Sequence, residues 1–171
     1  MFVLMRGGGD IATGIALRLW RSGMDVCICE IPVPTAIRRP VCFSEAVRLG
    51  EVTVEDVTAR LCEAEEIPDL LEQRIIPVLI DPEGAAISAL TPDVVVDAIL
   101  AKRNLGTSRD MAPLTIALGP GFVAGQDVDA VVETKRGHRL GRIIREGSAI
   151  PNTGIPGVIG GYGAERVIHA Q

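Results

Sequence analysis

Apolar residues along the first thirty positions change from a continuous run to a helical period and back to a run. Residues 2–5 are a short apolar run, typical of a buried strand, and three glycines end it. Within 11–19 the apolar positions recur at helical spacing, and 26–31 is again mostly apolar. The pattern predicts a strand–helix–strand unit, with Asp10 as the helix N-cap and Gly23 as its C-terminal stop.

The middle of the chain contains further apolar runs that are bounded by turn residues. These runs predict buried strands at 75–80, 93–98 and 114–118. Short helices are expected at 44–49, opened by Ser44 as N-cap, and at 63–72, where a proline implies a break or a late start. Strands that alternate with helices or loops are typical of a mostly parallel sheet, so the predicted fold class is α/β and Rossmann-like.

The pattern changes after residue 119, where glycine and proline become frequent. Two short apolar runs, 130–134 and 140–144, flank a five-residue turn that contains a glycine. This arrangement predicts a β-hairpin. We therefore expect a Rossmann-like domain over 1–120, followed over 121–171 by a small β-hairpin and glycine-rich region.

Composition narrows the class of protein further. Hydrophobic residues make up 47% of the chain and aromatic residues only 3%, so the core must be mostly aliphatic, which suits parallel strands covered by helices. The net charge is -5 and no basic run is interleaved with aromatics, which argues against nucleic acid as a partner. No apolar stretch approaches the length of a membrane span, and the first is too short for a signal peptide, so we expect a cytoplasmic protein without a membrane partner.

The four cysteines predict no metal site. Cys27, Cys29, Cys42 and Cys62 form no C-x-x-C pair, and no histidine lies near them at zinc spacing. Cys27 and Cys29 are two residues apart, so in a strand they would face the same side. They are interpreted as small buried hydrophobes, with a thiol or metal role as the alternative.

A glycine-rich turn carries the main functional hypothesis. Gly7, Gly8 and Gly9, followed by Ala12, satisfy G-x-G-x-x-A, a variant of the dinucleotide fingerprint. The first glycine allows the tight turn, the second lets the backbone approach a phosphate, and the small third residue lets the helix pack closely on the strand. The free N–H groups at the helix start would then point at an anion.

Two acidic residues bear on this hypothesis in opposite ways. Glu30 ends the second strand, where an acid can accept hydrogen bonds from a ribose, although a solvated strand end explains it as well. Asp10 lies inside the loop and would repel a phosphate unless it caps the helix and points away. A structural turn without any ligand is the alternative interpretation of the whole unit.

Other candidate residues follow the predicted strands. Arg38 and Arg39 come after the second strand, where arginines meet a 2′-phosphate or another anion, or are simply surface charges. Asp81 and Asp97 lie at strand ends that line the ligand crevice of an open α/β sheet. If Asp97 is buried it needs a partner, which the nearby Lys102 or Arg103 would supply.

The remaining candidates lie in the predicted hairpin turn. His138 is flanked by Arg136 and Arg139. It would act as a general acid–base only with a substrate beside it, and a solvated turn histidine is the alternative. The sequence contains no Ser-His-Asp or Cys-His arrangement and no paired carboxylates at metal spacing, so no catalytic residue is assigned.

Short segments in one order along the chain resemble a known family, the accessory proteins of selenium-dependent molybdenum hydroxylases, often called the YqeB family. The resembling segments are 7–14, 34–39, 43–47, 77–81, 92–104, 118–122, 133–138 and 153–157. Family members continue past the position of His169 into a glycine-rich β segment, so the resemblance marks this sequence as a short or truncated member. Carried over residue by residue, it marks Gly7, Gly9, Arg38, Arg39, Asp97 and the turn from Arg136 to His138.

The resemblance implies a pathway rather than a reaction. It implies a factor in the maturation of molybdopterin-containing hydroxylases, with the hydroxylase apoenzyme or its maturation proteins as partners. The expected ligand is a nucleotide, a dinucleotide such as NAD(P), or the nucleotide-bearing molybdenum cofactor. An NAD(P)-dependent oxidoreductase and a non-catalytic scaffold that docks the hydroxylase are the alternatives. The oligomeric state stays open, a homo-oligomer included.

Overall fold

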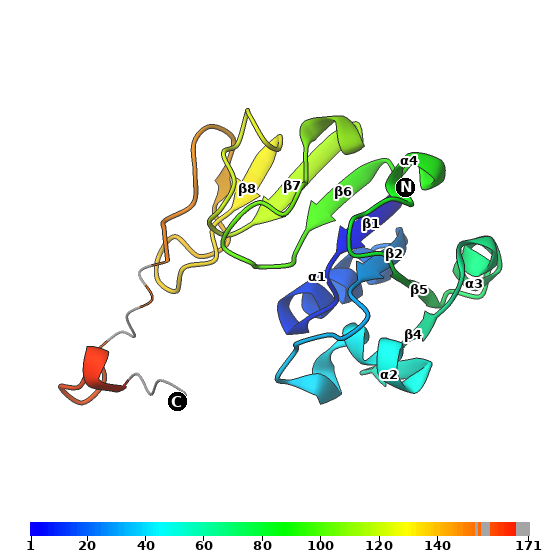
Figure 1. Ribbon diagram of the computed structural model, residues 1–171, viewed down its shortest axis with the longest axis horizontal. Helices are drawn as coiled ribbons and strands as arrows, with labels where there is room; N and C mark the ends of the chain where they lie inside the picture. Colours follow the sequence, from blue (N-terminus) through cyan, green and yellow to red (C-terminus); the bar gives the residue numbers. More distant parts are fainter. Residues whose placement is uncertain (153, 155–157, 167–171) are drawn as a thin grey trace.

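A single mostly parallel sheet organises the computed structural model, which describes residues 1–152, 154 and 158–166. Its nine strands lie in the order β3-β4-β5-β2-β1-β6-β7-β8-β9 (Figure 1). In this order the seven strands from β4 to β8 pair in parallel, and the edge strands β3 and β9 pair antiparallel with β4 and β8. The predicted α/β class with a mostly parallel sheet is confirmed. The strands are β1 (Phe2–Arg6), β2 (Asp25–Glu30), β3 (Glu51–Val54), β4 (Val57–Leu61), β5 (Ile76–Ile80), β6 (Val94–Asp97), β7 (Leu114–Leu118), β8 (Ala130–Val132) and β9 (Ile143–Ile144).

The strand order reverses direction at the centre of the sheet. From β1 the chain adds β2 and then β5 on one side, and it then returns to add β6, β7 and β8 on the other. Without the β3–β4 hairpin, this is the strand order 3-2-1-4-5-6 of a doubly wound dinucleotide-binding fold. The reversal between β1 and β6 is the topological switch point, where ligands bind at the carboxyl ends of the strands.

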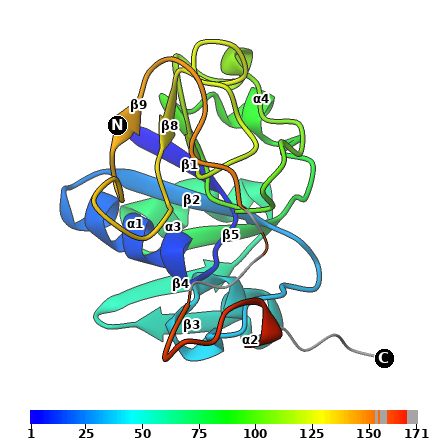
Figure 2. The same ribbon diagram turned by 90° about the vertical axis from the view of Figure 1, so that its left-hand side faces the viewer.

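Helices cover both faces of the sheet (Figure 2). Side chains of β1 alternate between the two layers: Val3 and Met5 pack with α1 and α2, whereas Leu4 packs with α3 and α4. The helices are α1 (Asp10–Arg21), α2 (Ala46–Leu49), α3 (Ile67–Glu72) and α4 (Ile87–Leu90). Because α2 and α4 each have four residues, α1, with 12, is the main helical cover at the switch point.

Glycines flank helix α1 on both sides. Gly9, not the predicted Asp10, is the N-cap, and Asp10 is the first helical residue. At the other end Gly23 adopts a φ of +83°, the left-handed conformation that commonly terminates a helix, as predicted. The single tryptophan, Trp20, fixes this end: its indole N–H donates to the carbonyl of Arg74 at 3.1 Å, and the Arg74 guanidinium stacks on its ring.

The segment between β2 and β5 departs most from expectation. Residues 52–61 alternate too weakly to predict an element, yet they contribute most of the β3–β4 hairpin, whose turn places Glu55 at a φ of 56°. The predicted cap at Ser44 is wrong, because Ser44 lies inside the 3-10 turn Phe43–Glu45 that precedes α2, and its buried hydroxyl has no hydrogen-bond partner among the described atoms. The helix expected over 63–72 is confirmed as a 3-10 turn, Ala64–Glu66, that leads into α3.

The hairpin expected after residue 119 is confirmed, but its strands are shorter than predicted. Strands β8 and β9 pair antiparallel, with Val131 opposite Ile144 and Val132 opposite Ile143. They extend the edge of the same sheet, so the division of the chain near residue 120 stays a prediction. His169 and most of 153–157 lie outside the described residues. Among the helices of the described residues, none has the length and apolar character needed to cross a bilayer.

Candidate functional site

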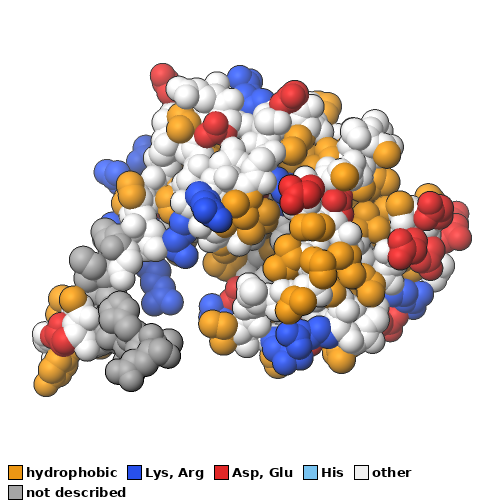
Figure 3. Space-filling view, in the orientation of Figure 1, with side chains coloured by type: hydrophobic (Ala, Val, Ile, Leu, Met, Phe, Trp, Pro, Cys, Tyr) orange, Lys and Arg blue, Asp and Glu red, His pale blue; other side chains and the backbone are white. Residues whose placement is uncertain are grey.

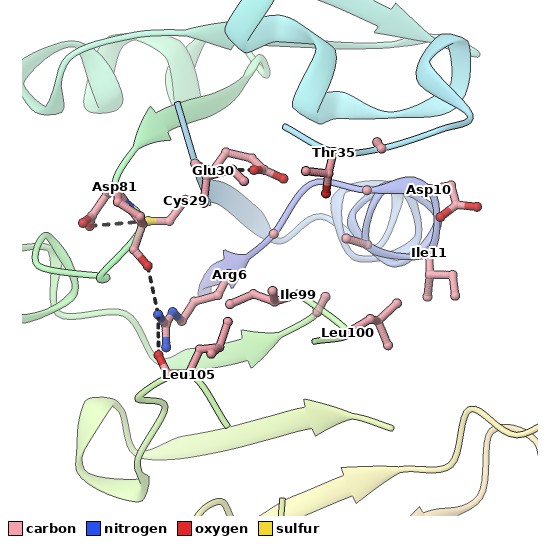
Figure 4. A pocket seen from close by; sticks show the side chains of 17 residues that line it. Arg6, Asp10, Ile11, Cys29, Glu30, Thr35, Asp81, Ile99, Leu100 and Leu105 are labelled. Carbon is pink, nitrogen blue, oxygen red and sulfur yellow. Dashed lines mark hydrogen bonds between the residues drawn. The ribbon is translucent and has the colours of Figure 1, made fainter. Parts of the chain in front are cut away.

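A crevice opens at the switch point, at the carboxyl ends of the central strands (Figure 4). Its volume is about 250 Å³. The glycine turn after β1 forms one wall, the residues after β6 form another, and the ends of β2 and β5 close it. The crevice therefore lies where the strand order alone places a ligand site.

The three glycines of the turn have different structural roles. Gly7 has a φ of +94°, and a Cβ there would lie 3.1 Å from the backbone of Ala98 and Ile99, so only glycine fits. A Cβ on Gly8 would lie 3.0 Å from the amide nitrogen of Ser44. Gly9 differs, because a Cβ on it would meet nothing within 4 Å. The turn is thus tightly held at Gly7 and Gly8 and open at Gly9.

The N-terminus of α1 faces the crevice without a side-chain cap. No side chain of the described chain accepts a hydrogen bond at the Gly9 cap. The first turn of the helix contains Asp10, Ile11 and Ala12, and all three line the crevice. Their backbone N–H groups have no intrahelical acceptor, and the helix dipole adds positive potential at this end of the helix. The site therefore offers hydrogen-bond donors to an anion.

Glu30 lies against the glycine turn. One carboxylate oxygen accepts the Gly8 N–H at 2.7 Å and the other accepts the Ile31 N–H at 2.8 Å. The carboxylate leaves the amides of Gly9 and Asp10 free and keeps further acceptor capacity on the crevice side. An acid at this position is suited to accept hydrogen bonds from hydroxyl groups of a ligand.

Asp10, Arg38 and Arg39 each form an ion pair near the site. Asp10 forms an ion pair with Arg38 at 2.7 Å and points away from Glu30 and Arg6 (Figure 4). Arg39 donates to both carboxylate oxygens of Glu45, which lowers the pKa of that carboxyl. Neither arginine lines the crevice itself: Arg38 is held beside the glycine turn by its ion pair with Asp10, whereas Arg39 is paired with Glu45.

A buried charge network that the sequence did not reveal lies at the base of the crevice. Arg6, at the end of β1, is 2% exposed and donates to the Thr107 hydroxyl at 2.6 Å. Thr107 in turn donates to Asp97 at 2.6 Å, and the Arg6 and Asp97 charges are 4.0 Å apart. The partner of Asp97 is therefore Arg6, and the expectation of Lys102 or Arg103 is wrong. Arg6 was missed because it reads as the solvated end of a strand.

Asp81 and Cys29 line the opposite side. Asp81 accepts the N–H groups of Ala85 and Ala86 at 2.9 Å, and the Cys29 thiol donates to it at 3.8 Å. Burial, followed by the Asp81 charge, raises the pKa of Cys29 to about 12. This thiol is therefore neutral at physiological pH, and Asp81 has a structural part in the loop before α4.

The other cysteines are also buried, as interpreted from the sequence. All four are free thiols, and Cys27 and Cys29 lie in the same layer with Cys62. Burial raises the pKa of Cys27 well above its usual value, and that of Cys62 to about 11. Nucleophilic thiolate chemistry is therefore disfavoured at these positions. Within the described ranges there is no cluster of three or more metal-ligating side chains.

The hairpin residues lie apart from the crevice. His138 is exposed in the turn between β8 and β9 and does not line it. Arg136 lines a different cleft, beside Lys102 and Lys135.

The crevice itself has apolar walls, which include Ile99, Leu100 and Leu105 (Figure 4). The crevice thus combines backbone N–H donors at the start of α1, the Glu30 carboxylate as an acceptor, and apolar walls.

Comparison with known proteins gives one strong similarity. The chain is 55% identical over 169 residues to a protein of Escherichia coli (strain K12) described as "Uncharacterized protein YqeB". The match covers 98% of this chain and 31% of the relative, so the chain spans about a third of that protein's length. This similarity supports the resemblance to the YqeB family. No family model and no solved structure matches the chain.

Proposed function

We propose that this relative of YqeB binds a nucleotide-type ligand in the crevice, with a phosphate at the start of α1. The observation that carries the proposal is the open glycine turn at the switch point: Gly9 has free space beside it, and the helix behind it has no side-chain cap. Helix N-termini of this kind bind phosphate through backbone N–H groups. Glu30 would accept hydrogen bonds from ribose hydroxyls, and the apolar wall would contact the base.

We further propose that the ligand serves the maturation of a selenium-dependent molybdenum hydroxylase. The resemblance of the segments quoted above and the similarity to YqeB support this role. The residues fit the nucleotide part of a nucleotide-bearing molybdenum cofactor, because donors for a phosphate and an acceptor for hydroxyls meet at one crevice. When bound, such a cofactor supplies the metal chemistry of the hydroxylase, and this chain's residues bind and orient it. The buried thiols give no support to a carrier role for selenium or sulfur.

The test uses the space beside Gly9. The Gly9→Leu variant should fold normally, because Gly9 has a φ of -65° and its Cβ position is free, yet its side chain would enter the anion site. Thermal shift is measured with NAD, NADP, ATP, CTP and CDP. At least one ligand should stabilise the unmodified chain, by about 2.7 kcal/mol at 100 times its dissociation constant, and Gly9→Leu should remove that response.

A matched control separates the site from the substitution. Gly14→Leu adds the same side chain on the exposed side of α1, where a Cβ also meets nothing within 4 Å. This variant should keep the ligand response. An equal response in the Gly9→Leu variant would place the site elsewhere, and no response to any nucleotide would favour the scaffold alternative.

A further inference from the structure

A second cleft lies, like the crevice, at the carboxyl ends of the parallel strands. The loops that follow β6 and β8, with residues after β9, form a hollow of about 330 Å³. We call it the basic cleft; its walls include Lys102, Pro120, Lys135, Arg136, Pro151 and Asn152. The loop after β6 connects the two sites, because Leu100 lines the crevice and Lys102 lines the basic cleft.

The cations of the basic cleft form no close ion pair among the described residues. Within the described part of the chain, Lys102, Lys135 and Arg136 have no carboxylate within 4.0 Å, although most arginines elsewhere are in ion pairs. The run from 135 to 145 contains five basic residues and no acidic one. In Figure 3 several Lys and Arg side chains lie on the left of the molecule and others at the bottom, and a group of acidic side chains lies on the right, near α3. Because the whole chain has a net charge of -5, the positive charge of the basic cleft is confined to one region of the surface.

One buried carboxylate ties two walls of the cleft together. Glu133 is 2% exposed and accepts the Lys135 N–H and the Ile150 N–H, each at 2.8 Å. Lys135 and Ile150 both line the cleft. Because the same side chain fixes both segments, the cleft is a built feature of the fold.

The loop that carries Lys102 is held as closely. Lys102 has a φ of 62°, a conformation that non-glycine residues adopt only when the surroundings impose it. A Cβ on Gly121 would lie 2.6 Å from the Arg103 backbone, and a Cβ on Gly119 would lie 2.6 Å from the Thr134 hydroxyl. The loops after β6, β7 and β8 are thus in close contact, and Lys102 lines the same cleft as Lys135 and Arg136.

We propose that the basic cleft binds a phosphate group of an elongated polyanionic ligand whose first phosphate lies at the glycine turn. This inference rests on the proposed function, because it places the second end of the same ligand. Lys and Arg donors hold phosphate oxygens by charge-assisted hydrogen bonds, and the Asn152 amide supplies a further donor. A rigid hollow suits a compact anion better than an acidic protein segment.

The test compares two double variants of equal charge. Lys135→Gln/Arg136→Gln removes two cations of the cleft, and Arg139→Gln/Arg145→Gln removes two exposed cations of the same run that do not line it. Calorimetric titration with NADP, ATP, CTP and tripolyphosphate is run at low and high salt. The cleft variant should bind about tenfold more weakly, with less salt dependence, and the control should stay within about twofold.

Several outcomes overturn the inference. Equal losses in both double variants would mean a diffuse positive field, and unchanged affinity in both would mean no subsite. Binding of polyglutamate but of none of the phosphates would identify a protein partner instead. Gly9→Leu keeps the two proposals distinguishable: if it abolishes binding while the cleft variant has no effect, the proposed function stands and the second subsite fails. If only the cleft variant weakens binding, the ligand does not bridge the two sites and the crevice proposal fails.

Discussion

The buried side chain of Glu133 makes the stability of the fold depend on pH, because its carboxylate holds the loops of the basic cleft. Burial raises its pKa, but hydrogen bonds from the backbone N–H groups of Ile150, Lys135 and Thr134 together outweigh burial, and the net pKa is lowered. A lowered carboxyl pKa contributes stability that is complete above the unfolded-state pKa of about 4.3 and is lost as the pH falls toward the folded-state value.

We therefore expect Glu133→Gln to be less stable than the unmodified chain at pH 7 and to lose less of its stability on acidification. Urea unfolding at pH 7 and at pH 4 measures both differences. The gap between the two proteins should narrow at pH 4, because the carboxylate that distinguishes them is then partly protonated. A gap that is constant with pH would mean that the charge of Glu133 contributes nothing.

Individual residues were predictable from the sequence where a local rule applies. Gly7 and Gly23 have the left-handed conformations that a tight turn and a helix end require, and the sequence suffices to find both. Arg6 and Asp97 were not predictable as a pair, because they are 91 positions apart and meet only when β1 pairs with β6. The same holds for Glu133, whose partner Ile150 lies beyond a complete hairpin.

Helix α1 contains two glycines with opposite energetic roles. Gly14 is exposed in the helix interior, where glycine costs about 0.5–1 kcal/mol relative to alanine. Gly23 has a φ of +83°, where alanine is strained. Neither position would bring a Cβ within 4 Å of a neighbour, so backbone conformation alone decides the effect of substitution.

Gly14→Ala should therefore stabilise the protein by up to about 1 kcal/mol, whereas Gly23→Ala should destabilise it by about 1 kcal/mol. Equilibrium unfolding in urea gives both free energies, and each variant serves as the control for the other. Equal shifts in the same direction would contradict the positions of the helix boundaries.

The strands of the central sheet were predictable because they are continuous apolar runs between turn residues, and five of them lie close to their expected positions. The β3–β4 hairpin was not, since its turn uses Glu55 at a positive φ rather than glycine or asparagine, and its edge position leaves β3 half exposed. Sequence patterns therefore located the central strands but neither their order nor the edge of the sheet.

The whole molecule protects its four thiols in different places. Cys27, Cys29 and Cys62 lie in the layer under α3 and α4, while Cys42 lies in the loop beside Arg38 and donates to its carbonyl at 3.1 Å. Cys29 also lines the crevice, whereas access to the fully buried Cys27 requires opening of the sheet–helix contacts.

Labelling with a disulfide reagent under native conditions should therefore be slow for all four thiols, because all are buried, and slower for Cys27 than for Cys29, which lines the crevice. Mass spectrometry of digested samples identifies the modified positions, and labelling in denaturant gives the fully accessible rate. Fast modification of Cys27 would show that the layer under α3 and α4 is open in solution.

The attachment of Trp20 to Arg74 has a practical consequence for following ligand binding. The chain's one indole lies at the far end of the helix whose first turn faces the crevice, and it is bound to the segment that leads into β5. Its emission therefore reports whether that helix shifts as a rigid rod against the sheet. A ligand that binds the open amides without moving the helix would leave the emission spectrum unchanged, whereas a ligand that displaces the helix would alter it. Fluorescence can therefore distinguish a preformed binding site from one that changes conformation on binding.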